Sequence, residues 1–196
     1  VEFNLSDYDK KDSELIYYSS VEEAILNSPL NAENEEFSVP EDFLNHVDEI
    51  LHIWNGKQYD TIFYRAGSDN DPVQGFVMAR CKKQVEEATV QYAFMNATPV
   101  TTKADSILIS DITELIHSSL KLSDFQQDLN PNYPDTRFVF GYAHDKEIYS
   151  LEVEGQKPDG VIEINVYDRT MYLWYYDDLK SDKRGNNLSY SVDMPE

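Results

Sequence analysis

The chain has few of the residues that stabilise small folds, such as cysteine, and few of the motifs that identify catalytic sites. It contains one cysteine, Cys81, seven glycines and eight prolines in 196 residues. A single cysteine excludes an intrachain disulfide, and it excludes structural zinc sites that need two or more cysteines. Cys81 ends an apolar run and is expected to be a buried thiol. No apolar stretch approaches the ~20 residues of a membrane-spanning helix, so we expect no membrane insertion.

Catalytic and ligand motifs are also missing. No serine lies in a nucleophile elbow, and no glycine-rich loop is present to hold a phosphate. The four histidines, His46, His52, His117 and His144, do not have the spacing of metal ligands. The acidic segment 68–71 lacks the Asp/Asn alternation, glycine and later glutamate of a calcium loop. We therefore expect no catalytic residue, no metal and no cofactor, and a protein that is not an enzyme.

One carboxylate pattern has two interpretations. Pro158 and Asp159 precede Glu163 and Asn165, an order found in nucleases that hold a divalent metal with Asp and Glu. Such nucleases place a lysine where this chain has Asn165. Pro-Asp-Gly is also a good turn sequence, and a strongly acidic chain repels the phosphate backbone. We favour the turn and expect no nucleic-acid binding.

Basic residues are few, and acidic ones are concentrated near the start. There are 37 Asp and Glu against 16 Lys and Arg, a net charge of -21. Residues 1–50 hold 14 acidic and 2 basic side chains, whereas residues 51–100 hold 5 of each. Such a field affects solubility and association rather than fold. The 14 Tyr, 9 Phe and 2 Trp nevertheless indicate a folded chain with a core.

Two helices are predicted in the first third. Ser20 and Glu23 have capping-box spacing before VEEAILNS. Ser38 and Glu41 have the same spacing, and an apolar stripe follows through residues 43, 44, 47, 50, 51 and 54, with Gly56 as the C-terminal cap. The second helix would carry an acidic outer face. A third helix is expected over DITELIHSSLKL, residues 111–122, with Ile112, Leu115, Ile116 and Leu120 on one face.

Most of the remaining residues are predicted to form β-strands. Strands are expected at 13–20, 59–66, 73–81 and 89–100, followed by a meander of 136–143, 147–154, 160–168 and 170–178 and an edge strand at 188–192. The predicted fold is α+β, a mainly antiparallel sheet with a C-terminal meander covered on one side by two or three helices. We expect a single domain, 1–196, with a helical acidic part at about 1–56 and a strand-rich remainder.

The function that fits best is an acidic inhibitor of a basic protein. Size, charge and lack of motifs suit an immunity protein that neutralises a bacterial toxin by binding a basic surface or active site. Carboxylates and exposed tyrosines would make the interface. The predicted partner-binding residues are Glu35, Glu36, Glu41, Asp42, Asp48, Glu49, Tyr175, Asp177 and Asp178.

Other functions stay open at this point. The acidity could serve solubility alone. The chain could mimic nucleic acid and block a DNA-binding defence enzyme, or it could be an enzyme with a carboxylate site. The sequence does not indicate an oligomeric state. Because the chain begins at Val1, both a cytoplasmic location and, after removal of a signal or anchor, an extracytoplasmic one are compatible with it.

Overall fold

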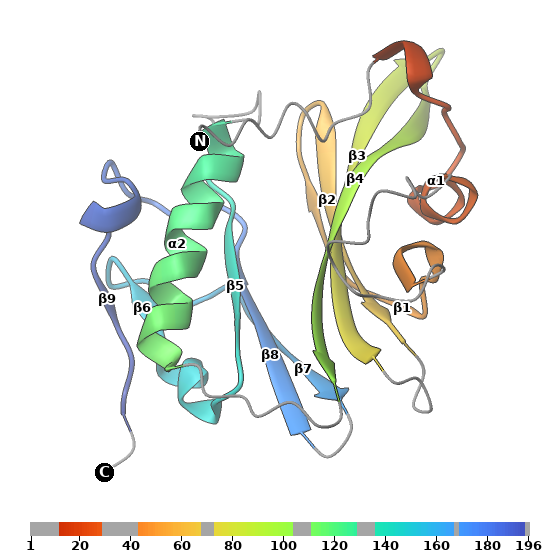
Figure 1. The fold of residues 1–196 in the computed structure, drawn as a ribbon. Coiled ribbons are helices and arrows are strands. Elements are labelled where there is room, and N and C mark those ends of the chain that lie inside the picture. The colour runs from red at the N-terminus through yellow and green to blue at the C-terminus, as the bar shows by residue number, and fades with distance from the viewer. Residues whose placement is uncertain are drawn as a thin grey trace, which may run out of the picture. The chain divides into compact units, whose positions relative to one another are not determined.

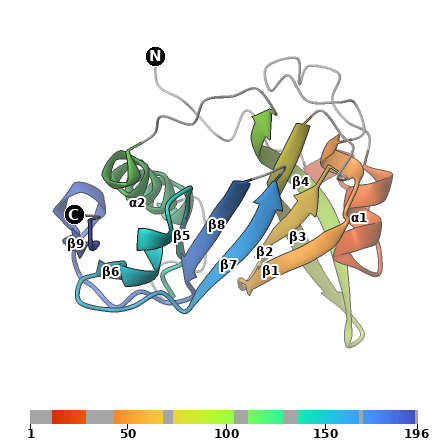
Figure 2. The same cartoon turned by 90° about the horizontal axis from the view of Figure 1, so that it is seen from below.

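The computed structural model describes residues 12–28, 43–67, 73–103, 111–128, 136–166 and 169–194. The fold is α+β, and every strand pair is antiparallel among these residues. Internal contacts divide the chain into two compact units, 1–104 and 105–196, whose elements are labelled in Figures 1 and 2. Folding as a single domain stays a prediction. None of the helices in the described ranges has the length and apolar content needed to cross a membrane.

The first unit is a four-stranded antiparallel meander with one helix. Its strands β1 (Glu49–Asn55), β2 (Tyr59–Ala66), β3 (Val73–Glu86) and β4 (Thr89–Lys103) pair in sequence order. Helix α1 (Val21–Asn27) packs against β3 and β4. Alternate side chains of β2 and β3 form the core with apolar residues of α1 and of the 3-10 turn Phe43–Asn45. That core comprises Val21, Ala24, Ile25, Phe43, Leu44, Ile62, Tyr64, Ala66, Val77, Ala79 and Cys81.

Helix α1 begins where its capping-box sequence predicts. Ser20 has extended backbone angles, and its hydroxyl accepts a hydrogen bond from the Glu23 amide at 3.1 Å. The Glu23 carboxylate in turn accepts from the Ser19 amide and hydroxyl. At the other end, the Asn45 side-chain amide donates to the Ile25 carbonyl at 2.7 Å. These bonds satisfy backbone groups that a helix leaves unpaired at its ends.

The predicted second helix is wrong. Residues 49–55 form strand β1, and only the 3-10 turn Phe43–Asn45 is helical in 43–56. The apolar side chains fit a strand as well as a helix, and Ile50 and Ile53 are β-branched residues that favour strands. Pairing with β2 decides between the two, with Ile53 opposite Ile62 and a register shift between Ile50 and His52. The N-terminal part is therefore not wholly helical. The proposed cap at Ser38 and Glu41 lies outside the described residues.

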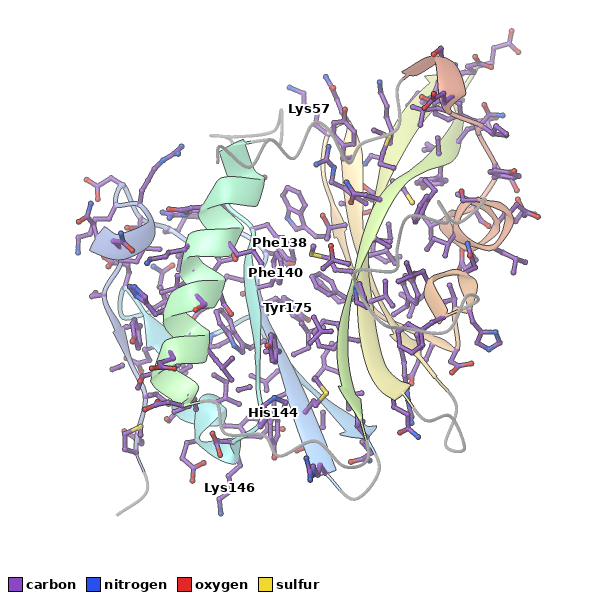
Figure 3. The ribbon with its side chains drawn as sticks, in the orientation of Figure 1. Lys57, Phe138, Phe140, His144, Lys146 and Tyr175 are labelled. Carbon is purple, nitrogen blue, oxygen red and sulfur yellow. The ribbon has the colours of Figure 1, made fainter. Side chains whose placement is uncertain are left out.

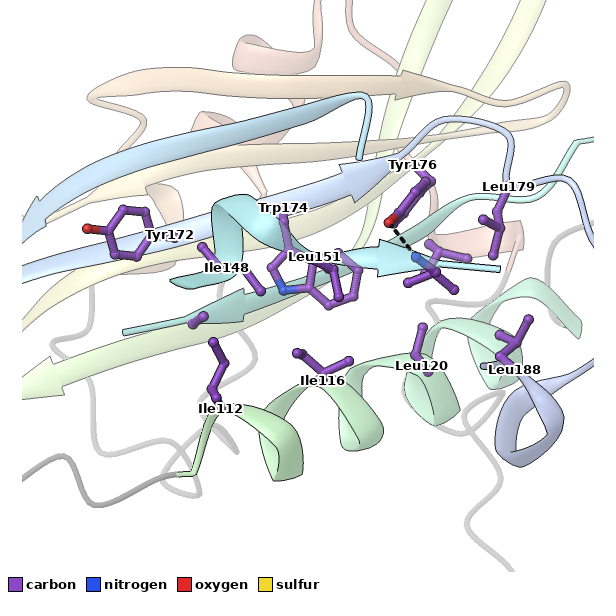
Figure 4. Packing of buried hydrophobic residues seen from close by; sticks show 13 residues of the cluster. Ile112, Ile116, Leu120, Ile148, Leu151, Tyr172, Trp174, Tyr176, Leu179 and Leu188 are labelled. Atoms are coloured by element: carbon purple, nitrogen blue, oxygen red, sulfur yellow. Dashed lines mark hydrogen bonds between the residues drawn. The ribbon is translucent and has the colours of Figure 1, made fainter. Parts of the chain in front are cut away.

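The second unit packs helix α2 (Ile112–Asp128) on the three-stranded sheet β5-β8-β7. The strands are β5 (Val139–Ala143), β7 (Gly160–Val166) and β8 (Arg169–Tyr176), and a separate pair joins β6 (Glu152–Val153) to β9 (Tyr190–Ser191). Figure 4 shows Ile112, Ile116 and Leu120 of α2 facing Trp174. As predicted, an apolar stripe at helical spacing forms the buried face of this helix.

The predicted meander is partly wrong. Residues 146–150 form a 3-10 helix, η5 (Lys146–Ser150), where a strand was expected. As a result β5 pairs with β8, and β6 leaves this sheet to pair with β9. The expected β7–β8 hairpin is present, with Glu163 opposite Tyr172. At 13–20, only Tyr18 makes a bridge, to Tyr92, and no strand forms.

Two contacts of α2 hold the edge of this sheet. The Ser123 hydroxyl donates to the Phe140 carbonyl at 3.0 Å and accepts from the Phe140 amide at 3.1 Å. These bonds occupy backbone groups on the outer edge of β5, which would otherwise offer a pairing site to another chain. Nearby, the buried Arg137 and the partly buried Asp124 form an ion pair at 2.6 Å. Asp124 also accepts from the Gly185 amide, so the pair fixes the loop before β9.

Candidate protein-binding surface

The predicted acidic residues of the first unit are only partly placed. Glu35, Glu36, Glu41 and Asp42 lie outside the described residues. Asp48 and Glu49 are exposed at the start of β1, and the Asp48 carboxylate lies 2.7 Å from His46 Nε2. The helix that was expected to carry them as an acidic face is absent from 43–56. Asp48 therefore precedes a strand and Glu49 begins it, and neither lines a helix.

Tyr175 and Asp177 lie at the end of β8, as predicted. Tyr175 is half-buried beside Phe140 of β5 (Figure 3), and its ring covers Gly160 of β7. The Asp159 carboxylate accepts from the Asp177 amide at 2.7 Å. The predicted hairpin turn at Pro158 and Asp159 is wrong, because β6 pairs with β9 and not with β7, and Asp159 lies in a bend just before β7. Burial raises the pKa of Tyr175, and the charges of Asp177 and Asp159 raise it further.

The rest of the aromatic run has a structural role. Trp174 and Tyr176 are buried on the α2 side of β8, because alternate residues of a strand point to opposite faces. The Tyr176 hydroxyl donates to the Gln156 carbonyl at 2.9 Å. Asp178 accepts from the Arg137 amide and pairs with Lys180. Of the three predicted residues in this unit, Tyr175 and Asp177 share one surface, and Asp178 is engaged in holding the fold.

Sequence reasoning missed a second group, which we name the tyrosine–carboxylate patch: Asp145, Glu147, Tyr149, Glu163 and Tyr172. Tyr149 of η5 is 51% exposed, and its hydroxyl donates to the Glu163 carboxylate of β7 at 2.7 Å. The Tyr149 and Tyr172 rings meet edge to face, with centroids 5.6 Å apart. The patch begins just after β5, where His144 and Lys146 are marked in Figure 3.

The phenols of this patch sit in a negative field. The pKa of Tyr149 is raised to about 12, first by its hydrogen bond to Glu163, then by burial and the Glu163 charge. The pKa of Tyr172 is raised by burial and by the charges of Glu163, Glu147 and Asp145. Both phenols are therefore neutral at physiological pH, Tyr149 beside the Glu163 carboxylate and Tyr172 in the field of Glu163, Glu147 and Asp145. An exposed ring face beside carboxylates is suited to a guanidinium or ammonium group.

Only part of this patch had a signal in the sequence. Glu163 and Tyr172 are opposite each other in a hairpin whose strands were expected, so their pairing follows from the register. Tyr149 was placed on a strand and therefore away from them. Its position depends on η5, a short 3-10 helix without a distinctive pattern. The contact between Tyr149 and Glu163 is thus a product of tertiary structure.

Metal chemistry gains no support here. No three His, Cys, Asp or Glu side chains of the described residues are arranged to hold an ion. The Asp159 carboxylate accepts from the Asp177 amide and the Glu163 carboxylate accepts from the Tyr149 hydroxyl, so the two carboxylates serve different contacts. Comparisons with protein-family models, curated proteins and solved structures give no match for this chain. The functional argument therefore rests on geometry and charge.

Proposed function

We propose that this chain is an acidic inhibitor of a basic protein, an immunity protein that neutralises a bacterial toxin by covering a basic surface or active site. The observation that carries the proposal is the tyrosine–carboxylate patch. There Tyr149 is half exposed and is oriented by Glu163 at 2.7 Å and by the edge of Tyr172. An ordered aromatic side chain loses little conformational entropy on binding, and tyrosine is common among the residues that dominate interface energies.

Charge supplies the selectivity for a basic partner. The net charge of -21 accelerates encounter with a positive surface, and carboxylates such as Glu163 form charge-assisted hydrogen bonds with Arg or Lys. An arginine over the Tyr149 ring would add about 0.5–2 kcal/mol of cation–π attraction. The pair Tyr175 and Asp177 offers a second aromatic and acidic contact on the same unit.

The test uses the purified full chain as bait to capture proteins from a cell lysate and a secreted fraction, at low and at moderate salt. The proposal predicts capture of one basic protein that forms a 1:1 complex, stays bound at moderate salt and loses its activity in the complex. Tyr149→Ala and Glu163→Gln should each weaken that complex about tenfold or more. Gln keeps an oxygen that can accept the Tyr149 hydroxyl, so Glu163→Gln removes mainly charge.

Two variants on α2 serve as matched controls. Leu122→Ala truncates a side chain as exposed as Tyr149, at 46%, and Glu114→Gln removes an exposed charge of the same unit. Both should bind within twofold of the unmodified chain. Recovery only of assorted basic proteins that wash off with salt contradicts the proposal. Release of the partner by duplex DNA, with steep salt dependence, would instead identify a nucleic-acid mimic.

A further inference from the structure

The β3–β4 hairpin carries a tip that no other strand supports. The last residue of β3 paired with β2 is Lys82, opposite Tyr59. Beyond Lys83 and its partner Tyr92, β3 and β4 pair only with each other up to Glu86 and Thr89. The six residues 85–90, which we name the hairpin tip, are all exposed. The joined ends of these strands are visible in Figure 2.

The turn of the hairpin tip has an unfavourable backbone. Glu87 has φ +47° and Ala88 has φ +72°, so both central residues are in the left-handed region. Two-residue hairpins with this φ pattern are normally built from Asn-Gly or Asp-Gly, which adopt it with little strain. Non-glycine residues held in such conformations are concentrated at functional sites. Glu87 therefore occupies a turn position at which Asn or Asp would give a more stable turn.

Another glutamate in the same conformation provides a comparison. Glu154 has φ +51°, and its carboxylate accepts hydrogen bonds from the amide and hydroxyl of Ser189 and pairs with Lys183 at 2.9 Å. These contacts explain why a glutamate is held there. The Glu87 carboxylate has no hydrogen bond or ion pair with any residue that the structure describes. Its strained position is not explained by contacts within the described chain.

The hairpin tip also exposes a pair of apolar side chains. Val85 and Val90 face each other across the strands and are 69% and 36% exposed. Glu86 and Glu87 lie beside them, and residues 84–91 contain no Lys or Arg. The combination fits a cleft with apolar walls and a basic floor. Burial of the valines would supply non-directional affinity, and the glutamates would supply the preference for a basic cleft.

We propose that the hairpin tip inserts into a cleft of the basic partner, with the Glu87 carboxylate against a Lys or Arg and Val85 and Val90 against apolar wall residues. This inference rests on the proposed function and adds a contact element from the first unit. Its chemistry requires that the partner be a protein with a basic cleft.

The test uses the full chain and the basic protein captured by it, with affinities measured by calorimetry. Glu87→Gln and Val85→Ser should each weaken binding about tenfold or more, as expected for contacts buried at an interface. Leu26→Ser and Glu22→Gln change exposed side chains of α1 in the same unit, outside the hairpin tip, and should bind within twofold. Circular dichroism and the unfolding midpoint verify that each variant is folded. A benzophenone attached through Ala88→Cys should crosslink the partner, whereas one attached through Glu114→Cys should not.

The two proposals fail in different ways. If Glu87→Gln and Val85→Ser bind within twofold and position 88 gives no crosslink, while Tyr149→Ala still weakens the complex, the hairpin tip is not inserted and the inhibitor proposal stands. If no protein meets the criteria for the partner, the inhibitor proposal is wrong and this inference falls with it. If an added Lys-rich peptide competes equally with all variants, binding is nonspecific and both are wrong.

Discussion

The close approach of α2 to β5 depends on Gly141. A Cβ atom at this position would lie 2.3 Å from Trp174 Cζ2 and 2.5 Å and 2.6 Å from Oγ and Cβ of Ser119. Favourable contacts between carbon atoms are about 3.5–4.0 Å apart. Gly141→Ala would therefore require both α2 and the fully buried Trp174 to move by about 1 Å.

The free energy needed to move α2 and Trp174 determines the expected loss of stability. Overpacking of a tightly packed core costs about 1–3 kcal/mol, and replacing a strand glycine by alanine returns about 0.5–1 kcal/mol through the unfolded chain. Because two neighbours are displaced here, we expect a net loss of about 2 kcal/mol for Gly141→Ala. In a protein of this length that corresponds to a fall in Tm of roughly 4–8 °C.

Gly160→Ala is the matched control. Its Cβ would lie 2.4 Å from the Tyr175 hydroxyl oxygen, an equally short distance. Tyr175 is half-buried, so its ring can rotate toward solvent, and we expect a loss below about 1 kcal/mol. Urea unfolding would be followed by fluorescence in a Trp54→Phe background, where Trp174 beside the new methyl group is the reporter. Equal costs for both variants, or an unchanged Gly141→Ala, would refute the packing argument.

Three further outcomes are expected. Arg137→Ala leaves the largely buried Asp124 carboxylate with the Gly185 amide but without its ion-pair partner and should cost about 3 kcal/mol in urea unfolding, the lower end for a buried pair, whereas a cost below about 1 kcal/mol would contradict it. The pKa of Glu154 is lowered from 4.5 to about 2 by hydrogen bonds from Lys183 and Ser189, so its contribution to stability is complete above pH 4.5 and is lost as pH falls toward 2. Glu154→Gln should therefore flatten the acid limb of the stability profile, and an unchanged profile would disprove the linkage. Ala88→Gly should raise the free energy of unfolding by up to about 1 kcal/mol, measured by thermal unfolding, because glycine adopts a positive φ without a Cβ clash.

Capping residues and apolar spacing correctly predicted the elements whose conformation depends on residues nearby in the sequence. Ser20 and Glu23 indicated the start of α1, and the spacing of Ile112, Ile116 and Leu120 indicated the buried face of α2. The signals failed where pairing between distant residues decides the structure. The stripe through Ile50 and Trp54 suits both a helix and a strand, and only the contact with β2 makes it a strand.

The candidate surface likewise includes contacts that the sequence could predict and contacts that it could not. Tyr175 and Asp177 are neighbours on one strand, so the sequence could place them together. Their link to Asp159 follows from the β7–β8 hairpin that the sequence also indicated. Tyr149 lies 14 residues before Glu163 in the chain, and the two meet only because η5 replaces the expected strand. No periodicity within residues 146–163 specifies that contact.

The acidity of the described chain has two physically different parts. Some carboxylates accept hydrogen bonds from backbone amides and hold loops in place: Asp60 with Gly56, Asp124 with Gly185, Glu154 with Ser189 and Asp159 with Asp177. Their removal should lower stability, because each leaves a backbone donor unpaired. Others, such as Glu87 at the hairpin tip and Glu163 beside Tyr149, are exposed and lie next to exposed apolar or aromatic side chains. Under the inhibitor proposal, only the second set should change affinity for the basic partner without changing stability.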